Sequence, residues 1–252
     1  MFEVSAILFD WGNTLARVAW QNDAWRRGVR AACNVLAMYR VVAEGAAEEL
    51  ERAMARAEAE AAADPACAEV RTESVFDAWA QAYGWEPVPE ELRVRAVRAF
   101  CEQWVGCLDP IPGALQTLAT LRDRGYRLGL ASNCWTPSEY AWAELRRQGF
   151  DRYLHAVTFS CEVGFRKPSA VFFRAAVNAL ALQPPPSPER VLFVGDSPLC
   201  DIAPAAAAGM RTAWVRGPSG AWASQPQATV RPDVSVRWVG ELLPLLPSPP
   251  GP

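Results

Sequence analysis

Apolar runs that alternate with helical patterns mark both ends of this sequence as parts of one α/β fold. Residues 4–9 form a run that is apolar except for Ser5 and stops at Asp10, which is typical of a short strand buried on both faces of a sheet. From residue 113 onward, short apolar runs are separated by helical patterns of about 10 to 15 residues, and this alternation indicates βαβ units and a parallel sheet. We predict strands at 127–131, 156–160, 190–194, 211–215 and 234–236, and helices at 113–124, 137–148, 168–181, 199–209 and a last one that ends at Leu246.

The middle of the chain has a different character, because Ala, Arg, Glu and Trp recur there at helical spacing. Turn residues at 64–65 and 84–87 interrupt the pattern. We interpret this helical module as an insertion into the α/β core, joined to it through the segments around Arg17 and Asp109. The predicted helices of the insertion lie near 20–41, 44–63, 72–84 and 90–104.

Charge and composition narrow the classes of function. The 252 residues carry 25 basic and 28 acidic side chains, a formal net charge of -3, so no basic field is available for nucleic acid or an anionic membrane. The longest charge-free stretches fall short of the roughly 18 apolar residues of a membrane span, and the first residues lack a secretory signal pattern, so we expect a cytoplasmic protein. Seven cysteines without a Cys-x-x-Cys pair predict neither a disulfide framework nor a zinc site.

Polar residues suited to catalysis or metal binding follow the predicted strands of the core. Asp10 comes after the first strand, Ser132 after the second, and Asp196 and Asp201 follow the strand at 190–194, while Lys167 lies in the turn before a helix. Open α/β sheets place their sites at the carboxyl ends of strands, so these groups are expected to meet. Three converging carboxylates would repel one another, which indicates a hard divalent cation, magnesium above all, bound by oxygen ligands. Such a site suits an anionic substrate.

Two residue types are so rare that their positions carry information. Lys167 is the only lysine among the 25 Lys and Arg residues, which suggests that a compact ammonium is needed there. His155 is the only histidine and excludes a metal site with two histidines. Trp11 and Trp135 lie near the predicted site and are interpreted either as packing residues or as the lining of a pocket. Most tryptophans of the helical module are expected in its core, and one or two of them face the substrate in the alternative interpretation: Trp20, Trp25, Trp79, Trp85 and Trp104.

The segments 10–15, 131–133, 164–168 and 195–201, taken in this order, resemble the four motifs of the haloacid dehalogenase (HAD) superfamily. The resemblance covers the core and not the helical module. It implies a Rossmann-like parallel sheet core at residues 1–17 and 107–252, with a helical cap domain at residues 18–106 inserted between the first and second motifs. It also implies hydrolysis by a covalent mechanism through an aspartate.

The resemblance assigns the metal ligands and the nucleophile position by position. Asp10 matches the nucleophile and also a magnesium ligand, and Gly12 matches the position whose backbone carbonyl binds magnesium. Asp196 matches a further metal ligand, and Asp201 matches the second acidic residue of the fourth motif, although on its own Asp201 would equally suit a helix cap.

The remaining candidates would bind the transferred group. Ser132 matches the hydroxyl that binds this group, and Lys167 matches the cation that steadies it. From the residues themselves, Thr14 and the backbone amides after Asp10 can cradle phosphoryl oxygens. Asn133 either contacts the substrate or closes a turn.

One position departs from the family pattern. Phosphatases of this superfamily carry an aspartate two residues after the nucleophile as general acid and base, but this chain has Gly12 there. General acid-base assistance is typically worth about 100- to 10,000-fold. We therefore predict magnesium-dependent hydrolysis of a small phosphomonoester through an aspartyl-phosphate on Asp10, and keep two alternatives open: a 2-haloacid dehalogenase-like hydrolase, or a catalytically weak binding protein of the same fold.

Overall fold

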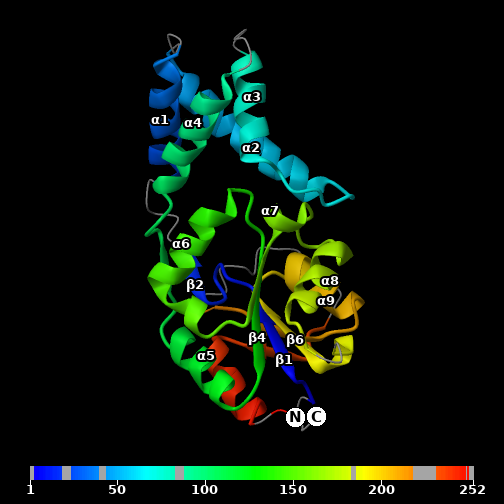
Figure 1. Ribbon diagram of the computed structural model, residues 1–252. Coiled ribbons are helices and arrows are strands. Elements are labelled where there is room, and N and C mark those ends of the chain that lie inside the picture. Colours follow the sequence, from blue (N-terminus) through cyan, green and yellow to red (C-terminus); the bar gives the residue numbers. More distant parts are fainter. Residues whose placement is uncertain are drawn as a thin grey trace.

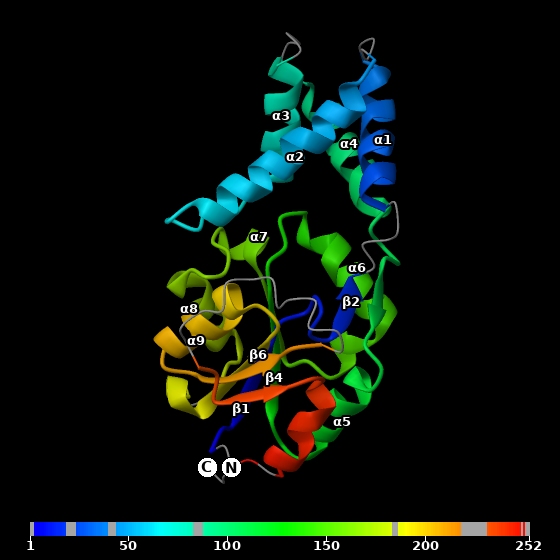
Figure 2. The ribbon, with the colours of Figure 1, turned by 180° about the vertical axis from the view of Figure 1, so that it is seen from behind.

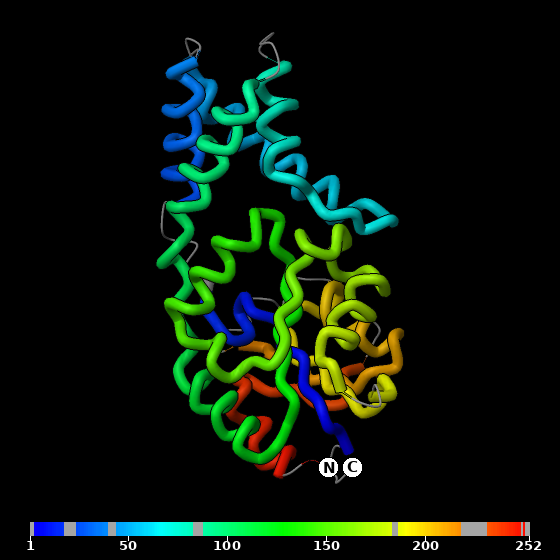
Figure 3. Tube along the Cα trace, in the orientation of Figure 1, coloured from blue at the N-terminus to red at the C-terminus, as the bar shows by residue number. Residues whose placement is uncertain are grey.

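A computed structural model describes residues 3–18, 24–39, 44–82, 88–182, 186–217, 231–247 and 249. Figure 1 shows an α/β core below a group of helices that comes from the middle of the chain. The Cα trace in Figure 3 follows the chain out of the core after residue 18 and back into it near residue 108.

A six-stranded sheet forms the centre of the core, with the strand order β5-β4-β1-β6-β7-β8 and parallel pairing between neighbours. This confirms the predicted parallel α/β sheet. The innermost strand β1 consists only of buried residues, as a strand covered on both faces should. The strands are β1 (Ala6–Phe9), β4 (Arg127–Ser132), β5 (Ala156–Phe159), β6 (Val191–Gly195), β7 (Arg211–Val215) and β8 (Val234–Val236).

Helices cover both faces of the sheet, and the alternation of side chains along β1 shows how. Ile7 and Phe9 point to one face, where they share an apolar core with α5 (Ala114–Asp123), α6 (Ser138–Gln148) and the 3-10 segment η4 (Val239–Leu245). Ala6 and Leu8 point to the other face, against α8 (Ala170–Ala179) and α9 (Ala203–Ala207). Figure 2 shows the sheet between these two layers.

The helical module has an apolar core of its own, separate from the cores that flank the sheet. This core contains Leu50, Met54, Phe76, Trp79 and Phe100, all almost completely buried. The expectation that Trp79 packs in the core of the module is therefore confirmed, whereas Trp20 and Trp85 lie outside the described residues. The cap boundaries at 18 and 106 stay a prediction, which this separate core supports. The helices are α1 (Ala24–Ala37), α2 (Ala46–Ala63), α3 (Thr72–Ala82) and α4 (Glu90–Glu102).

Several elements differ from the predicted ones. The strands β2 (Ala16–Val18) and β3 (Leu108–Pro110) form an antiparallel pair at the base of the helical module, with Arg17 opposite Asp109; both are too short to produce a recognisable pattern. The predicted helix at 199–209 begins as a π-turn, η3 (Pro198–Ile202), and continues as α9. The predicted final helix is η4, a 3-10 segment that contains Pro244, because proline cannot donate a helical hydrogen bond.

Three short segments complete the description: η1 (Phe150–Arg152), α7 (Ser160–Val163) and η2 (Pro188–Arg190). None of the helices in the described parts of the chain combines the length and the apolar character that a membrane span requires.

Candidate active site

The carboxyl edge of the sheet brings the predicted residues together. Asp10 directly follows β1, Ser132 ends β4, and Asp196 directly follows β6. Because β1 is paired with both β4 and β6, these three side chains leave the sheet side by side. Each of them is at most 8% exposed, so the edge forms a buried polar floor.

Lys167 is part of this floor and not a surface lysine. Its Nζ lies 2.5 Å from Asp10 Oδ1 and 2.7 Å from Asp201 Oδ1. Burial alone would lower the pKa of the ammonium, but the carboxylates of Asp10 and Asp201 outweigh this effect and raise the pKa above its usual range. Lys167 therefore stays charged and holds two acidic side chains from different elements.

Three carboxylates lie close together at this single ammonium. Ligand oxygens of Asp10, Asp196 and Asp201 all lie within 4.8 Å of one another. Burial raises the pKa of Asp10 to about 6, with Lys167 opposing and Asp201 adding to the rise. Burial and the neighbouring Asp10 and Asp201 raise the pKa of Asp196 to about 8.

The surplus negative charge fits a bound divalent cation. In the described part of the chain, Asp196 has no ion-pair partner, while Lys167 pairs with Asp10 and Asp201. Closely spaced, buried carboxylate oxygens are the donors that Mg²⁺ prefers. A bound cation would offset the burial and the mutual repulsion that raise the pKa values of Asp10 and Asp196.

Asp201 acts as an internal brace and not as a helix cap. Its Oδ2 accepts a hydrogen bond from the Ser197 backbone N–H at 2.9 Å, and its Oδ1 accepts one from Lys167. The cap of the following turn is Ser197, whose Oγ accepts from the Cys200 N–H. Gly195 makes the brace possible, because a Cβ at this position would lie 2.4 Å from the Asp201 carboxyl group.

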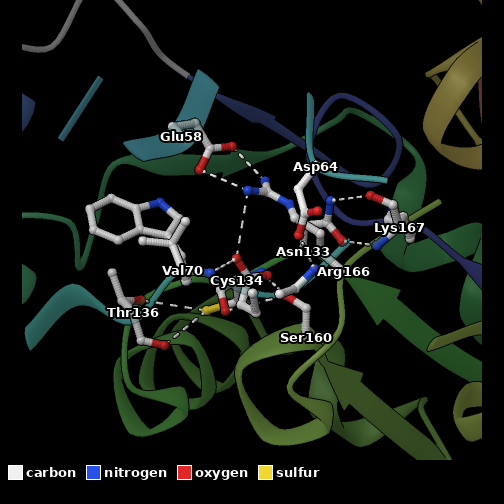
Figure 4. Close-up of polar contacts among 12 residues, drawn as sticks. Glu58, Asp64, Val70, Asn133, Cys134, Thr136, Ser160, Arg166 and Lys167 are labelled. Atoms are coloured by element: carbon white, nitrogen blue, oxygen red, sulfur yellow. Dashed lines mark hydrogen bonds and ion pairs between the residues drawn. The ribbon is translucent and has the colours of Figure 1, made fainter. Parts of the chain in front are cut away.

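Asn133 positions Lys167 through its side-chain amide. The Asn133 Oδ1 accepts a hydrogen bond from the Lys167 backbone N–H at 2.8 Å, and its Nδ2 donates to the Lys167 carbonyl at 3.4 Å (Figure 4). The structure thus links the loop after β4 to the turn that carries the ammonium. Asn133 also lines the cavity described below, so a role in substrate contact stays a prediction.

The other predicted residues also lie at or next to the floor. Thr14 is 1% exposed, and its Oγ1 has no hydrogen-bond partner among the described residues. Gly12 is half-buried and is not among the described glycines with positive φ. Among the described residues, the Ser132 Oγ makes only a long contact of 3.3 Å to the Asn133 carbonyl, which leaves this hydroxyl available for a ligand.

A contact between the helical module and the core lies next to Lys167, at residues for which the sequence predicts no role. The Arg166 guanidinium donates to both carboxylate oxygens of Glu58 in α2, at 3.1 and 2.5 Å (Figure 4). The backbone of residue 166 also donates to the Cys67 carbonyl at 2.9 Å, and the Glu69 N–H donates to the Gly164 carbonyl at 3.1 Å. No local sequence pattern signals these pairings, because the partners are far apart in the chain.

A cavity of about 930 Å³ lies above the floor and below α2. Figures 1 and 2 show how α2 extends from the helical module across the top of the core toward α7. Floor residues such as Gly12, Ser132 and Asn133 line the cavity together with tryptophans from both parts of the chain. A small molecule held under the helices would therefore meet Ser132 and the residues next to the floor, whereas Asp10, Lys167, Asp196 and Asp201 are not among the lining residues.

Comparisons with known proteins agree with this architecture. A family model described as haloacid dehalogenase-like hydrolase matches residues 4–209. The chain is 33% identical over 141 residues to a glyceraldehyde 3-phosphate phosphatase of Methanopyrus kandleri, which covers 56% of this chain and 58% of the relative. It is 34% identical over 127 residues to a phosphoserine phosphatase of Thermus thermophilus, which covers 50% of this chain and 48% of the relative. The chain spans about half the length of the curated relatives it matches.

A solved structure extends the likeness to the whole chain. The 2-haloacid dehalogenase of Pseudomonas syringae superposes with a TM-score of 0.67 at 22% identity, over 97% of this chain and 98% of that chain. At this identity the superposition shows a shared fold. The family model runs from the first strand past α9, and the chain therefore belongs to the haloacid dehalogenase-like hydrolase family.

Proposed function

We propose that this protein is a magnesium-dependent phosphatase that hydrolyses a small phosphomonoester through a phosphorylated Asp10. The observation that carries the proposal is the buried cluster of Asp10, Asp196 and Asp201 around one ammonium, next to a cavity that Gly12 and Ser132 line. Buried, mutually repelling acids with raised pKa values are characteristic of functional sites. The names of the relatives, phosphatases acting on small metabolites, support the same reaction.

The residues of the floor suit a displacement in two steps. An oxygen of Asp10 attacks phosphorus, the bond from phosphorus to the ester oxygen breaks, and the alcohol leaves with the electron pair of that bond. Water then attacks the phosphorus of the aspartyl-phosphate, which releases inorganic phosphate and regenerates Asp10. In both steps Lys167 offsets the charge of the phosphoryl group, and Ser132 and Thr14 would donate hydrogen bonds to its oxygens.

Magnesium would be held by Asp10, Asp196 and the Gly12 carbonyl, with Asp201 supporting the cluster. When bound, the ion supplies positive charge that reduces the repulsion between the nucleophile and the phosphate dianion. Lys167 alone leaves the cluster with excess negative charge, since three carboxylates face one ammonium.

Gly12 determines how the leaving group departs, because it provides no general acid. Without a carboxyl group at this position, the departing alcohol takes its proton from water. Turnover should therefore depend strongly on the acidity of the leaving group, and aryl or acyl phosphates should react faster than alkyl phosphates.

Carbon–halogen hydrolysis is the second candidate reaction. In that case Asp10 would attack carbon and form an ester, and no metal would be required. The cluster of three carboxylates favours the phosphatase, because a site that works without a cation has no use for repelling acids.

The test is a panel of phosphorylated metabolites and 2-haloacids, each assayed for phosphate or halide release with Mg²⁺ and with EDTA. We expect phosphate release that needs Mg²⁺. Halide release that is indifferent to EDTA would replace the proposal with the dehalogenase reaction, and binding of phosphorylated ligands without any turnover would replace it with a binding function.

A further inference from the structure

One wall of the cavity is built from tryptophans of the helical module and the core together. Trp25 lies in α1, Trp104 lies just after α4, and Trp135 lies in the loop after β4; all three line the cavity. The ring centroid of Trp25 is 5.7 Å from that of Trp104, at 83°, and 5.7 Å from that of Trp135, at 57°. Such tilted and edge-to-face arrangements are favourable for aromatic pairs, so the three rings form a fixed apolar surface, hereafter the tryptophan wall.

The roof of the cavity is made of small side chains on one face of α2. Ala55, Ala59 and Ala62 line the cavity at helical spacing, and all three are exposed. Their methyl groups leave most of the space below the helix open. The resulting volume of about 930 Å³ is at the upper end of the roughly 300 to 1,000 Å³ that is usual for small-molecule pockets, which is more than a phosphate group alone requires.

The charges that line the cavity are already paired. Glu58 is bound by Arg166, and Glu144 is bound by Arg147. Arg26, the one cationic side chain of the lining in the described residues, lies 3.6 Å from Glu51 and has a side chain that is 64% exposed.

A second anionic group on the substrate would therefore find no unpaired cation in the described lining of the cavity. Lys167 is already occupied, since it lies at the floor and binds Asp10 and Asp201. An added carboxylate or phosphate would instead face the lining carboxylates of Glu51, Glu58 and Glu144, which repel it. The described lining thus favours a leaving group without charge.

The chemistry at Gly12 points to the same class of leaving group. A phenol has a pKa near 10, as the tyrosine side chain does, and departs as a stable phenoxide. An aliphatic alkoxide resembles hydroxide, whose conjugate acid water has a pKa of about 15.7, and needs an acid that position 12 does not provide. The aromatic lining of the wall and the lack of a carboxyl group at position 12 are independent observations.

We propose that the tryptophan wall and the alanine roof select phosphomonoesters whose leaving group is an uncharged aromatic alcohol. This inference rests on the proposed phosphatase function and deepens it by naming the substrate class. Trp25, Trp104, Trp135 and Ala59 are its specificity-determining residues, and the floor residues bind the phosphoryl group.

A matched pair of substrates separates recognition of the ring from acidity of the leaving group. 2-Phenylethyl phosphate and butyl phosphate both release an aliphatic alcohol, but only the first carries an aromatic ring. We expect a KM at least about 10-fold lower for 2-phenylethyl phosphate, and a poorer kcat/KM for 3-phosphoglycerate, which carries a carboxylate, than for either. Equal KM values for the phenylethyl and butyl esters would overturn the inference.

A variant of the roof tests the charge argument without disturbing the packed wall. Ala59→Arg introduces an unpaired cation under α2 and should raise kcat/KM for 3-phosphoglycerate at least about 10-fold while it weakens the preference for the phenylethyl ester. Ala63→Arg places the same cation at an exposed position of α2 that does not line the cavity, and it should leave both values unchanged. Identical behaviour of the two variants would contradict the assignment of Ala59 to the subsite.

A binding measurement distinguishes failure of the subsite from failure of the proposed function. Phenylphosphonate and butylphosphonate, which cannot be hydrolysed at an ester bond, are titrated calorimetrically into the wild type and Ala59→Arg in the presence of Mg²⁺. Tighter binding of phenylphosphonate, reduced in Ala59→Arg, would support the subsite even if no phosphate ester turned over. Equal binding of the two phosphonates would overturn the subsite even if the protein proved to be a phosphatase.

Discussion

The floor and the roof of the cavity hold their positions in different ways. The floor consists of a few charged groups with defined partners: Lys167 binds Asp10 and Asp201, and Asn133 holds the backbone of Lys167. The roof and the tryptophan wall rely on ring packing and on small side chains. Directional contacts between buried charges fail when one atom is misplaced, whereas apolar packing tolerates volume-conserving changes.

The two regions are therefore expected to have different roles in the reaction. The floor would carry the chemistry and accept almost no substitution, and the roof and the tryptophan wall would select the substrate. Arg166 and Glu58 connect the two regions next to Lys167.

The largest effect is expected for Asp10→Asn. An amide can neither attack phosphorus nor balance the charge of a cation, so phosphate release should fall by at least about 10,000-fold. Asp109→Asn changes an exposed aspartate in β3 and serves as the control, with activity near that of the wild type. An Asp10→Asn protein that kept a tenth of the wild-type rate would show that another group forms the covalent bond.

Gly195→Ala should be nearly as damaging, although it adds only one methyl group. The new Cβ would lie 2.4 Å from the Asp201 carboxyl group and would force this brace away from Lys167. We expect at least about 100-fold lower kcat and a free energy of unfolding lowered by roughly 1 to 3 kcal/mol, the usual cost of overpacking. Gly240→Ala, where the nearest atom is at 3.5 Å, should leave kcat unchanged; equal kcat values for the two variants would contradict the role of Asp201.

Lys167→Arg keeps the charge but changes its shape. The ammonium is a compact donor between Asp10 and Asp201, and the planar guanidinium is too large for a space in which Lys167 is only 4% exposed. A decrease in kcat of about 10- to 100-fold is expected, measured with a substrate that carries a good leaving group. An Arg variant with wild-type kcat would show that the floor needs only the charge.

Glu58→Gln tests the connection between floor and roof. The change weakens the bidentate ion pair with Arg166, which is 45% exposed on the Glu58 side, so the effect should be modest: about 3- to 10-fold in kcat/KM, mostly through KM. Glu60→Gln changes an exposed residue on the same helix that does not line the cavity and should have no effect. A loss in both variants would assign the effect to the charge of α2 in general.

The smallest expected effect is a pH dependence of stability without metal. Burial and the neighbouring acids raise the pKa of Asp196 to about 8, so between pH 5 and 8 the folded state keeps a proton that the unfolded state has lost. Stability from this group therefore falls as the pH rises. In EDTA, the melting temperature of the wild type should fall by at least about 2 °C relative to that of Asp196→Asn as the pH rises from 5 to 8. At pH 8, adding Mg²⁺ should raise the melting temperature of the wild type again, but not that of Asp196→Asn. Parallel curves for the two proteins would contradict the raised pKa.

The sequence was sufficient to predict most of the core. The runs around β1, β4, β6 and β7 are apolar because both faces of these strands are buried, and such runs are recognisable without a structure. Asp10, Ser132 and Asp196 could be located for the same reason, since each lies at or next to the end of such a strand. Lys167 lies in the turn that Asn133 connects to the end of β4.

The connection and the pairing of rings in the tryptophan wall could not be predicted, although a pocket lining was one of the two interpretations of Trp135. The pairing of Glu58 with Arg166 joins residues that are 108 positions apart, and the wall joins Trp25 to Trp135 across the inserted helices. Helical spacing identifies which residues share a helix face, but it does not determine how one helix lies above another part of the chain. The antiparallel pair β2 and β3 was missed because three residues each give no periodicity.

Acid quenching during turnover can trap the phosphorylated Asp10 on which the proposed mechanism depends. The protein is mixed with a good phosphomonoester substrate and Mg²⁺, quenched in acid within the first turnover, digested, and analysed by mass spectrometry. We expect one phosphoryl group on the peptide that contains Asp10, absent in EDTA and absent in Asp10→Asn. Rapid phosphate release with no phosphoryl group on that peptide at any quench time, together with an active Asp10→Asn protein, would contradict the proposed mechanism.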